Sequence, residues 1–128
     1  LILVALSSGP LESKWRWPMI QGPLYAFDRQ TGQLLWTKGI ENRGFPLEQP
    51  RNLPLIMLVD TVTQGKGTMA MASSRFLILD SRTGETIHEV IEPGSTPRYR
   101  WERDQATASA QLILSQQKIR YDFAMPKQ

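Results

Sequence analysis

Short apolar runs alternate with turn-forming residues along the whole chain, and the spacing of the apolar positions favours strands over helices. Glycine and proline, nine of each, fall between these runs, as they do where turns join short strands. In the last third of the chain, apolar and polar residues alternate with a period of two, which is typical of antiparallel strands with one solvated face. The expected strands are Leu1–Leu6, Leu24–Phe27, Gln33–Thr37, Leu53–Val62, Thr68–Ala72, Arg75–Leu79, Glu85–Ile91, Arg98–Arg103, Ser109–Leu114 and Lys118–Phe123. The pattern predicts an all-β fold without helices.

One segment of the chain occurs twice. Leu24–Trp36 and Phe76–His88 each contain an apolar strand, the motif Asp-x-x-Thr-Gly and a second strand. An aspartate that ends a strand can accept hydrogen bonds from the backbone N–H groups ahead of it, and glycine supplies the positive φ of a short loop. The residues expected to build the two hairpins are Asp28, Thr31, Gly32 and Trp36 in the first copy and Asp80, Thr83 and Gly84 in the second. A repeat of this length is typical of stacked units of the propeller type.

At these residues the chain resembles the PQQ-like repeat family, whose propeller blades occur in quinoprotein dehydrogenases and in outer-membrane assembly lipoproteins of the BamB type. The first copy has the family pattern Tyr-Ala-x-Asp-x-x-Thr-Gly, with a tryptophan four residues after the glycine. The second copy departs from it at Ile78, where the family prefers alanine, and at His88, where it prefers the tryptophan that docks one blade onto the next. Together the two segments cover about a fifth of the chain.

The resemblance implies a partial β-propeller in a single unit, 1–128. Residues 1–40 would form an incomplete first blade, 53–91 a second blade of four antiparallel strands, and 97–124 a C-terminal β-meander. Because a closed propeller needs about four to eight blades, the chain is expected to be the C-terminal part of a longer protein. A small independent β-domain that self-associates is the alternative.

Two segments are long enough to be loops that bind a partner, Ser7–Gly22 and Gly39–Asn52. They contain the residues proposed as binding anchors, Trp15, Arg16, Trp17 and Phe45. In Lys14–Trp17 and again in Arg98–Arg103, cations alternate with aromatic residues, a pattern suited to sugar rings or polyanions. The same alternation arises in a strand that buries its aromatic residues, and this interpretation is favoured for Arg98–Arg103; for Lys14–Trp17, packing is favoured over contact with a ligand.

Composition narrows the chemistry. The 128 residues are 41% hydrophobic and 21% charged, with a net charge of +3, which fits one globular domain. There is no cysteine, which excludes disulfides and thiolate metal sites, and His88 is the only histidine, which excludes sites that need several. No run of apolar residues approaches the length of a spanning helix. The sequence predicts no catalytic residue, no cofactor-binding residue and no metal ligand within this chain.

The expected function is that of a non-catalytic scaffold for protein interactions in the bacterial cell envelope or periplasm. Its expected partners are other proteins, including a membrane-associated assembly, and the remaining blades of a larger propeller; nucleic acid is not expected. A PQQ-dependent quinoprotein dehydrogenase is the first alternative. The resemblance ties that activity to a calcium ion and a vicinal disulfide, and the chain has no cysteine to form one. A binder of carbohydrate or polyanions through a Trp/Arg loop is the second alternative.

Overall fold

The computed structural model describes residues 1–5, 18–46, 48–50, 53–64, 71–94, 96–104 and 106–122. Within these ranges the chain forms strands and no helix, so the all-β prediction is confirmed. The strands are β1 (Ile2–Ala5), β2 (Met19–Phe27), β3 (Leu34–Gly44), β4 (Leu55–Gln64), β5 (Met71–Asp80), β6 (Thr86–Pro93), β7 (Tyr99–Asp104), β8 (Ser109–Leu114) and β9 (Lys118–Asp122).

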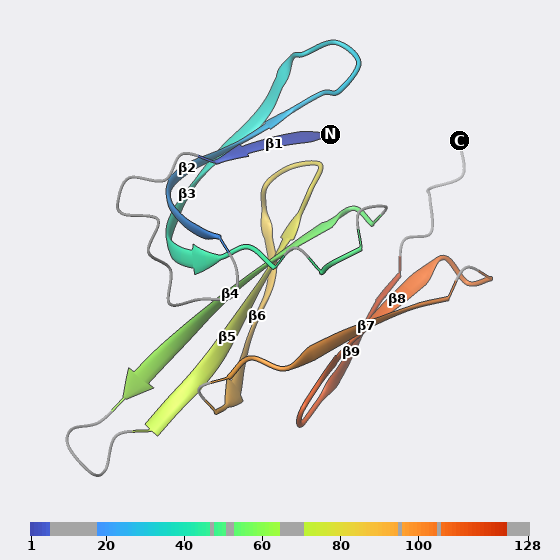
Figure 1. Cartoon of the computed structure of the whole chain (residues 1–128). Helices are drawn as coiled ribbons and strands as arrows, with labels where there is room; N and C mark the ends of the chain where they lie inside the picture. Colours follow the sequence, from blue (N-terminus) through green and yellow to red (C-terminus); the bar gives the residue numbers. More distant parts are fainter. Residues whose placement is uncertain are drawn as a thin grey trace.

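All neighbouring strands are antiparallel, and their order in space follows the chain. Strands β1 to β6 form a six-stranded sheet, and β7 to β9 form a three-stranded sheet. In the larger sheet β3 meets β4 at a single pair, Gly44 and Val59, whereas β4 and β5 pair along their whole length. The sheet is therefore best described as a first layer, β1–β3, and a second layer, β4–β6, with β7–β9 as the third layer (Figure 1).

The second layer lies between the other two, because β4 and β5 bury both faces. Alternate residues such as Leu58 and Leu77 pack against the first layer, while Met57 and Phe76 pack against the third. A strand that is buried on both faces needs apolar side chains at nearly every position, which explains the continuous apolar runs in β4 and β5. The core toward the first layer contains Ile20, Leu24, Ala26, Trp36, Ile40, Ile56, Leu58, Leu77 and Leu79. The core toward the third layer contains Leu53, Leu55, Met57, Val59, Phe76, Ile78, Val90, Ala110, Leu112, Leu114 and Tyr121.

The structure describes three strands within 53–91, where a four-stranded blade was expected. Of the predicted strand Thr68–Ala72, residues 68–70 lie outside the described residues, while Met71 and Ala72 join Arg75–Leu79 in one strand, β5. Ser73 and Ser74, which separate these two predicted strands, lie inside β5. The hydroxyl of Ser74 donates a hydrogen bond to the carbonyl of Gly94 at 2.8 Å, which lets a polar residue lie buried in the strand.

The two predicted loops are shorter than expected. Strand β2 begins at Met19, inside the expected loop Ser7–Gly22, and β3 continues to Gly44, inside the expected loop Gly39–Asn52. Met19 pairs with Gly44, so the hairpin of the first layer extends beyond 1–40. The register shift between Ile20 and Gly22 is a β-bulge, which accommodates the positive φ of Gly22 within β2. No propeller blades are identified in the part of the chain that the structure describes.

Candidate interaction site

The first repeated turn is held by the carboxylate of Asp28. Its Oδ1 accepts hydrogen bonds from the backbone N–H groups of Gln30 at 2.8 Å and Thr31 at 3.1 Å. The N–H of Gly32 donates to the carbonyl of Asp28 at 2.9 Å, and Gly32 has a φ of 72°. The two backbone bonds lower the pKa of the Asp28 carboxyl, because they stabilise its charged form.

The second turn repeats this arrangement. Asp80 Oδ1 accepts from the N–H of Arg82 at 2.8 Å, and the N–H of Gly84, whose φ is 76°, donates to the carbonyl of Asp80 at 2.8 Å. The side chain of Arg82 also contacts the carboxylate, and this hydrogen bond is the main reason why the pKa of Asp80 is lowered. In both turns the threonine hydroxyl accepts the N–H two residues ahead, at 3.3 Å for Thr31 and 3.2 Å for Thr83.

Trp36 connects the first layer to the second turn. Its indole Nε1–H donates a buried hydrogen bond of 2.8 Å to the carbonyl of Ser81. The ring lies directly against Gly84, where a Cβ atom would come within 2.7 Å of Cδ2 and Cε3 of the indole. Gly84 is therefore required twice, for its positive φ and for the space that the ring occupies. The turn and the tryptophan form one docking contact between two repeats.

His88 follows Gly84 by the same four residues that separate Trp36 from Gly32. It lies in β6 opposite Ile78, and its side chain is exposed. No hydrogen bond of His88 is found in the described part of the chain, so the second repeat has no counterpart of the Trp36 contact there.

A third turn of related geometry joins β7 to β8 and was missed by the sequence analysis. Asp104 Oδ1 accepts the N–H of Ala106 at 3.0 Å, and Ala108 has a φ of 50° where the other turns have glycine. The signal was present as Asp-x-x-Thr, with Thr107 at the threonine position. The sequence pattern did not identify this turn because alanine stands where the motif has glycine.

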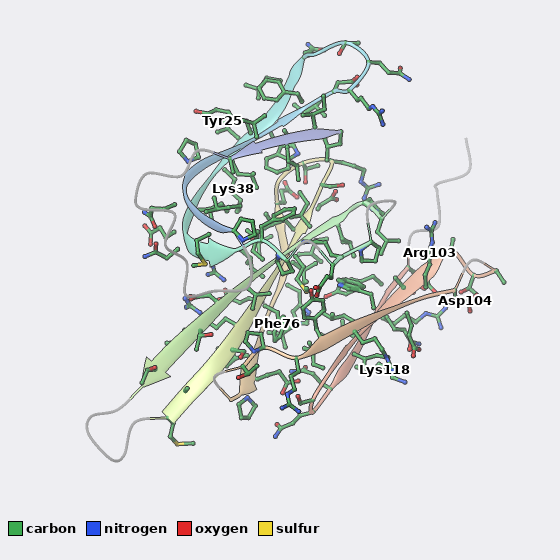
Figure 2. All side chains as sticks on the ribbon, viewed as in Figure 1. Tyr25, Lys38, Phe76, Arg103, Asp104 and Lys118 are labelled. Atoms are coloured by element: carbon green, nitrogen blue, oxygen red, sulfur yellow. The ribbon has the colours of Figure 1, made fainter. Side chains whose placement is uncertain are left out.

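The outer face of the first layer is apolar. Ile2 and Val4 of β1 pair with Phe27 and Tyr25 of β2, so these four side chains lie on one face, and Leu35 points the same way because its neighbour Trp36 points inward. Ile2, Val4 and Leu35 are 47%, 41% and 46% exposed. We call these five residues the outer apolar face. Figure 2 shows Tyr25 at the top of the molecule, on the first layer and distant from Lys118 of the third.

The outer face of the third layer is charged instead. Arg100 pairs with Glu102 at 2.9 Å, and Arg120 pairs with Asp122 at 3.0 Å. All four side chains are exposed, and Figure 2 places the neighbouring Lys118 on the same layer. The two ends of the stack of layers therefore differ in chemistry.

The predicted anchors occupy different places. Trp15, Arg16 and Trp17 lie outside the described residues. Phe45 is half-buried, packs against the core between the first and second layers, and lines a cavity of about 590 Å³. Part of the Phe45 side chain therefore contributes to the core and is not free to contact a partner.

The cation-aromatic segment Arg98–Arg103 is largely strand β7. Tyr99 and Trp101 pack against the core, as the strand interpretation predicted, and Arg98 and Arg100 are exposed. The segment also forms one wall of a groove of about 730 Å³, whose other wall includes Pro50.

Comparison of the chain with protein-family models, with curated proteins and with solved structures found no match. Among the described residues, no group of three or more histidine, cysteine, aspartate or glutamate side chains is placed to hold a metal ion. Over the same part of the chain, no helix is long and apolar enough to cross a membrane.

Proposed function

We propose that the chain is a segment of a β-propeller of the PQQ-like repeat type that acts as a non-catalytic scaffold for protein interactions. The observation that carries the proposal is the docking of Trp36 onto the second turn, with a hydrogen bond to Ser81 and ring contact at Gly84. This contact uses the two most specific positions of the repeated motif, the tryptophan and the glycine. It joins one copy of the motif to the next.

The direction in which the layers face also supports a repeat. In the first two layers, the residue two positions before the turn aspartate, Ala26 or Ile78, packs against the layer that follows. In the last two, the residue three positions before that aspartate, Leu77 or Trp101, packs against the layer that precedes. Successive layers thus face the same way, as stacked repeats do, whereas the two sheets of a sandwich face each other.

A stack of this kind suits a scaffold because its surface is set by rigid sheets. A rigid surface loses little conformational entropy when a partner binds. Trp15 and Trp17, which lie outside the described residues, would supply aromatic anchors of the kind that dominate binding energy at interfaces. By its resemblance to the envelope branch of the family, the protein would work in the bacterial periplasm or cell envelope.

The proposal is tested by immobilising the 128-residue chain and identifying cross-linked proteins from a bacterial envelope extract. We expect saturable capture of a defined protein partner, and at least a ten-fold weaker interaction after Trp15→Ala and Trp17→Ala together. His88→Ser, which replaces an exposed ring side chain in β6, is the control. Capture that is unchanged by the double substitution would remove these anchors from the proposal.

Two further measurements separate the alternatives. An absorbance shift when PQQ and calcium are added would favour a dehydrogenase. Salt-sensitive retention on heparin, lost in Arg98→Gln with Arg100→Gln, would favour a polyanion binder acting through the groove beside β7.

A further inference from the structure

Strand β7 is an edge strand of the third layer, because β8 is the only described strand that pairs with it (Figure 1). In the first two layers, the strand before the repeated turn is paired on both sides: β2 lies between β1 and β3, and β5 lies between β4 and β6. Strand β7 also precedes a turn of this kind, but no described strand lies where β1 and β4 lie in the other layers. The described part of the third layer therefore has an open edge.

The hydrogen bonds of β8 show which backbone groups of β7 point toward this edge. The N–H of Leu114 donates to the carbonyl of Gln117, on the side of β9. Because the bonds of an antiparallel strand alternate between its two neighbours, the residues of β8 that bond to β7 are those opposite Arg100 and Glu102. The backbone N–H and C=O of Trp101, which lies between these two, therefore point to the open edge.

A groove beside the edge has room for an added strand. Its volume is about 730 Å³, and its lining includes Arg100 and Trp101. A residue of an extended strand fills about 160 Å³, which follows from the spacing of strands, the spacing of packed sheets and the rise per residue. The groove can therefore hold about four or five residues of another strand.

The charges along this segment are antisymmetric about Trp101. Arg100 comes one position before it and Glu102 one position after it. Arg98 comes three positions before it and Asp104 three positions after it. All four charged side chains are exposed, and their spacing of two residues puts them on one face of the sheet. If two such strands pair antiparallel with Trp101 opposite Trp101, each arginine lies opposite a carboxylate of the other strand. The edge is thus complementary in charge to a second copy of itself.

We infer that two copies of the chain associate through β7, in antiparallel register, with Trp101 at the two-fold axis. Trp101 of each copy would exchange its N–H and C=O bonds with the other, and the two third layers would form one continuous sheet. Arg100 pairs with Glu102 within one copy at 2.9 Å, so each of these charges would lie between two opposite charges in the dimer. The association uses the edge of the third layer and leaves the outer faces of the stack uncovered, so it is independent of layers added at either end.

Sedimentation equilibrium of the 128-residue chain tests the inference. We expect a monomer of 14.6 kDa in reversible equilibrium with a species of twice that mass. Arg100→Glu should weaken the dimer at least ten-fold, and so should Glu102→Arg, because each substitution puts like charges opposite one another at two places. Arg120→Glu is the matched control, since it reverses a charge of the ion pair with Asp122 on β9, and it should change the affinity less than two-fold.

A mixture of the two single variants separates pairing between copies from the ion pair within one copy. Each variant has lost its internal pair. A chain with Arg100→Glu and a chain with Glu102→Arg nevertheless carry opposite charges at both facing positions. We therefore expect a mixed dimer whose affinity is at least ten-fold higher than that of either variant alone. A mixture that associates no more tightly than the single variants would overturn the inference.

Amide hydrogen exchange followed by NMR locates the interface. Exchange at Trp101 should slow as the protein concentration rises, whereas exchange at Arg100 and Glu102, whose amides already bond to β8, should change little. A dimer that instead protects Ile2 and Val4 would place the contact on the outer apolar face and would overturn the inference.

A chain that stays monomeric at every concentration would also overturn it, whether or not the edge then binds a strand of another protein. The capture experiment with Trp15→Ala and Trp17→Ala uses other variants and another readout. The self-association and the scaffold function therefore fail separately.

Discussion

Replacing each turn glycine with alanine separates the strain of the turn from the docking of Trp36. Gly32 and Gly84 have nearly the same φ, 72° and 76°, and close turns with the same hydrogen bonds. Alanine in this left-handed region costs about 1–2 kcal/mol. Alanine also makes the unfolded chain less flexible, which offsets about 0.4–1 kcal/mol of this cost. Gly32→Ala should therefore lower the free energy of unfolding by about 1 kcal/mol, since no described atom contacts the new methyl group.

Gly84→Ala carries the same backbone cost and a steric one. The methyl group would lie 2.7 Å from two ring atoms of Trp36, so the indole must move. Overpacking of this kind costs about 1–3 kcal/mol. Loss of the buried hydrogen bond to Ser81 adds about 1 kcal/mol or more. We expect a total loss of about 3–5 kcal/mol, at least 2 kcal/mol more than for Gly32→Ala.

Urea unfolding followed by circular dichroism measures both variants without relying on tryptophan fluorescence. A variant as unstable as Gly84→Ala could unfold entirely, so the cycle is completed in a Trp36→Leu background. There the steric cost disappears, and Gly84→Ala should cost about 1 kcal/mol, like Gly32→Ala. Equal losses for the two glycines in the wild-type background would refute the docking contact as a source of stability.

Three more predictions concern the other turns and the third layer. Ala108→Gly should raise the free energy of unfolding by about 0.5–1 kcal/mol in urea unfolding, because Ala108 has a φ of 50° and pays the left-handed cost that glycine avoids. Burial raises the pKa of Tyr121 from its usual 10.0 to about 12, so the hydroxyl ionises in the unfolded chain at a lower pH than in the folded chain. The free energy of unfolding should therefore fall by up to about 3 kcal/mol between pH 10 and 12. Urea unfolding over this pH range should show the fall in the wild type and not in Tyr121→Phe. The lowered pKa of Asp80 gives the opposite dependence: its stabilisation is present above the usual pKa of 3.8 and is lost as the pH falls below that value. Asp80→Asn removes the bonds of the carboxylate to Arg82 and should lower the free energy of unfolding by about 1 kcal/mol at pH 7. In thermal melts, this variant should also lose less stability than the wild type when the pH is lowered.

The sequence predicted where the strands lie more accurately than where each strand begins and ends. Runs in which both faces are buried, such as β4 and β5, are visible as continuous apolar segments. Strand β2 begins before Pro23, a residue that normally ends strands. Within the described residues, β1 pairs only with Leu24–Phe27, so no described strand lies on that side of β2 at Pro23, which is where a proline is tolerated. A pattern in one segment cannot report where its neighbour in the sheet ends.

The same limit applies to the site. The roles of Asp28 and Gly32 in the turn could be predicted, because all of their hydrogen-bond partners lie within the same short motif. The partner of Trp36 is separated from it by 45 positions along the chain, and the choice of Ser81 depends on how the two layers pack. The resemblance to the PQQ-like repeat therefore implied that a tryptophan docks between repeats, but the sequence did not predict which carbonyl it reaches.

The charged end of the stack limits how the layers can be extended. A further layer on the third layer would cover Glu102, which stands where Ala26 and Ile78 are buried in the layers before it. Removing such ions from water costs several kcal/mol each, on the order of the whole stability of a small domain. The outer apolar face has the opposite balance, because covering it removes apolar surface from water. A further layer on the first layer therefore needs only an apolar face, whereas a layer on the third layer, which closure of a propeller ring would require, must offer charges that match the two ion pairs.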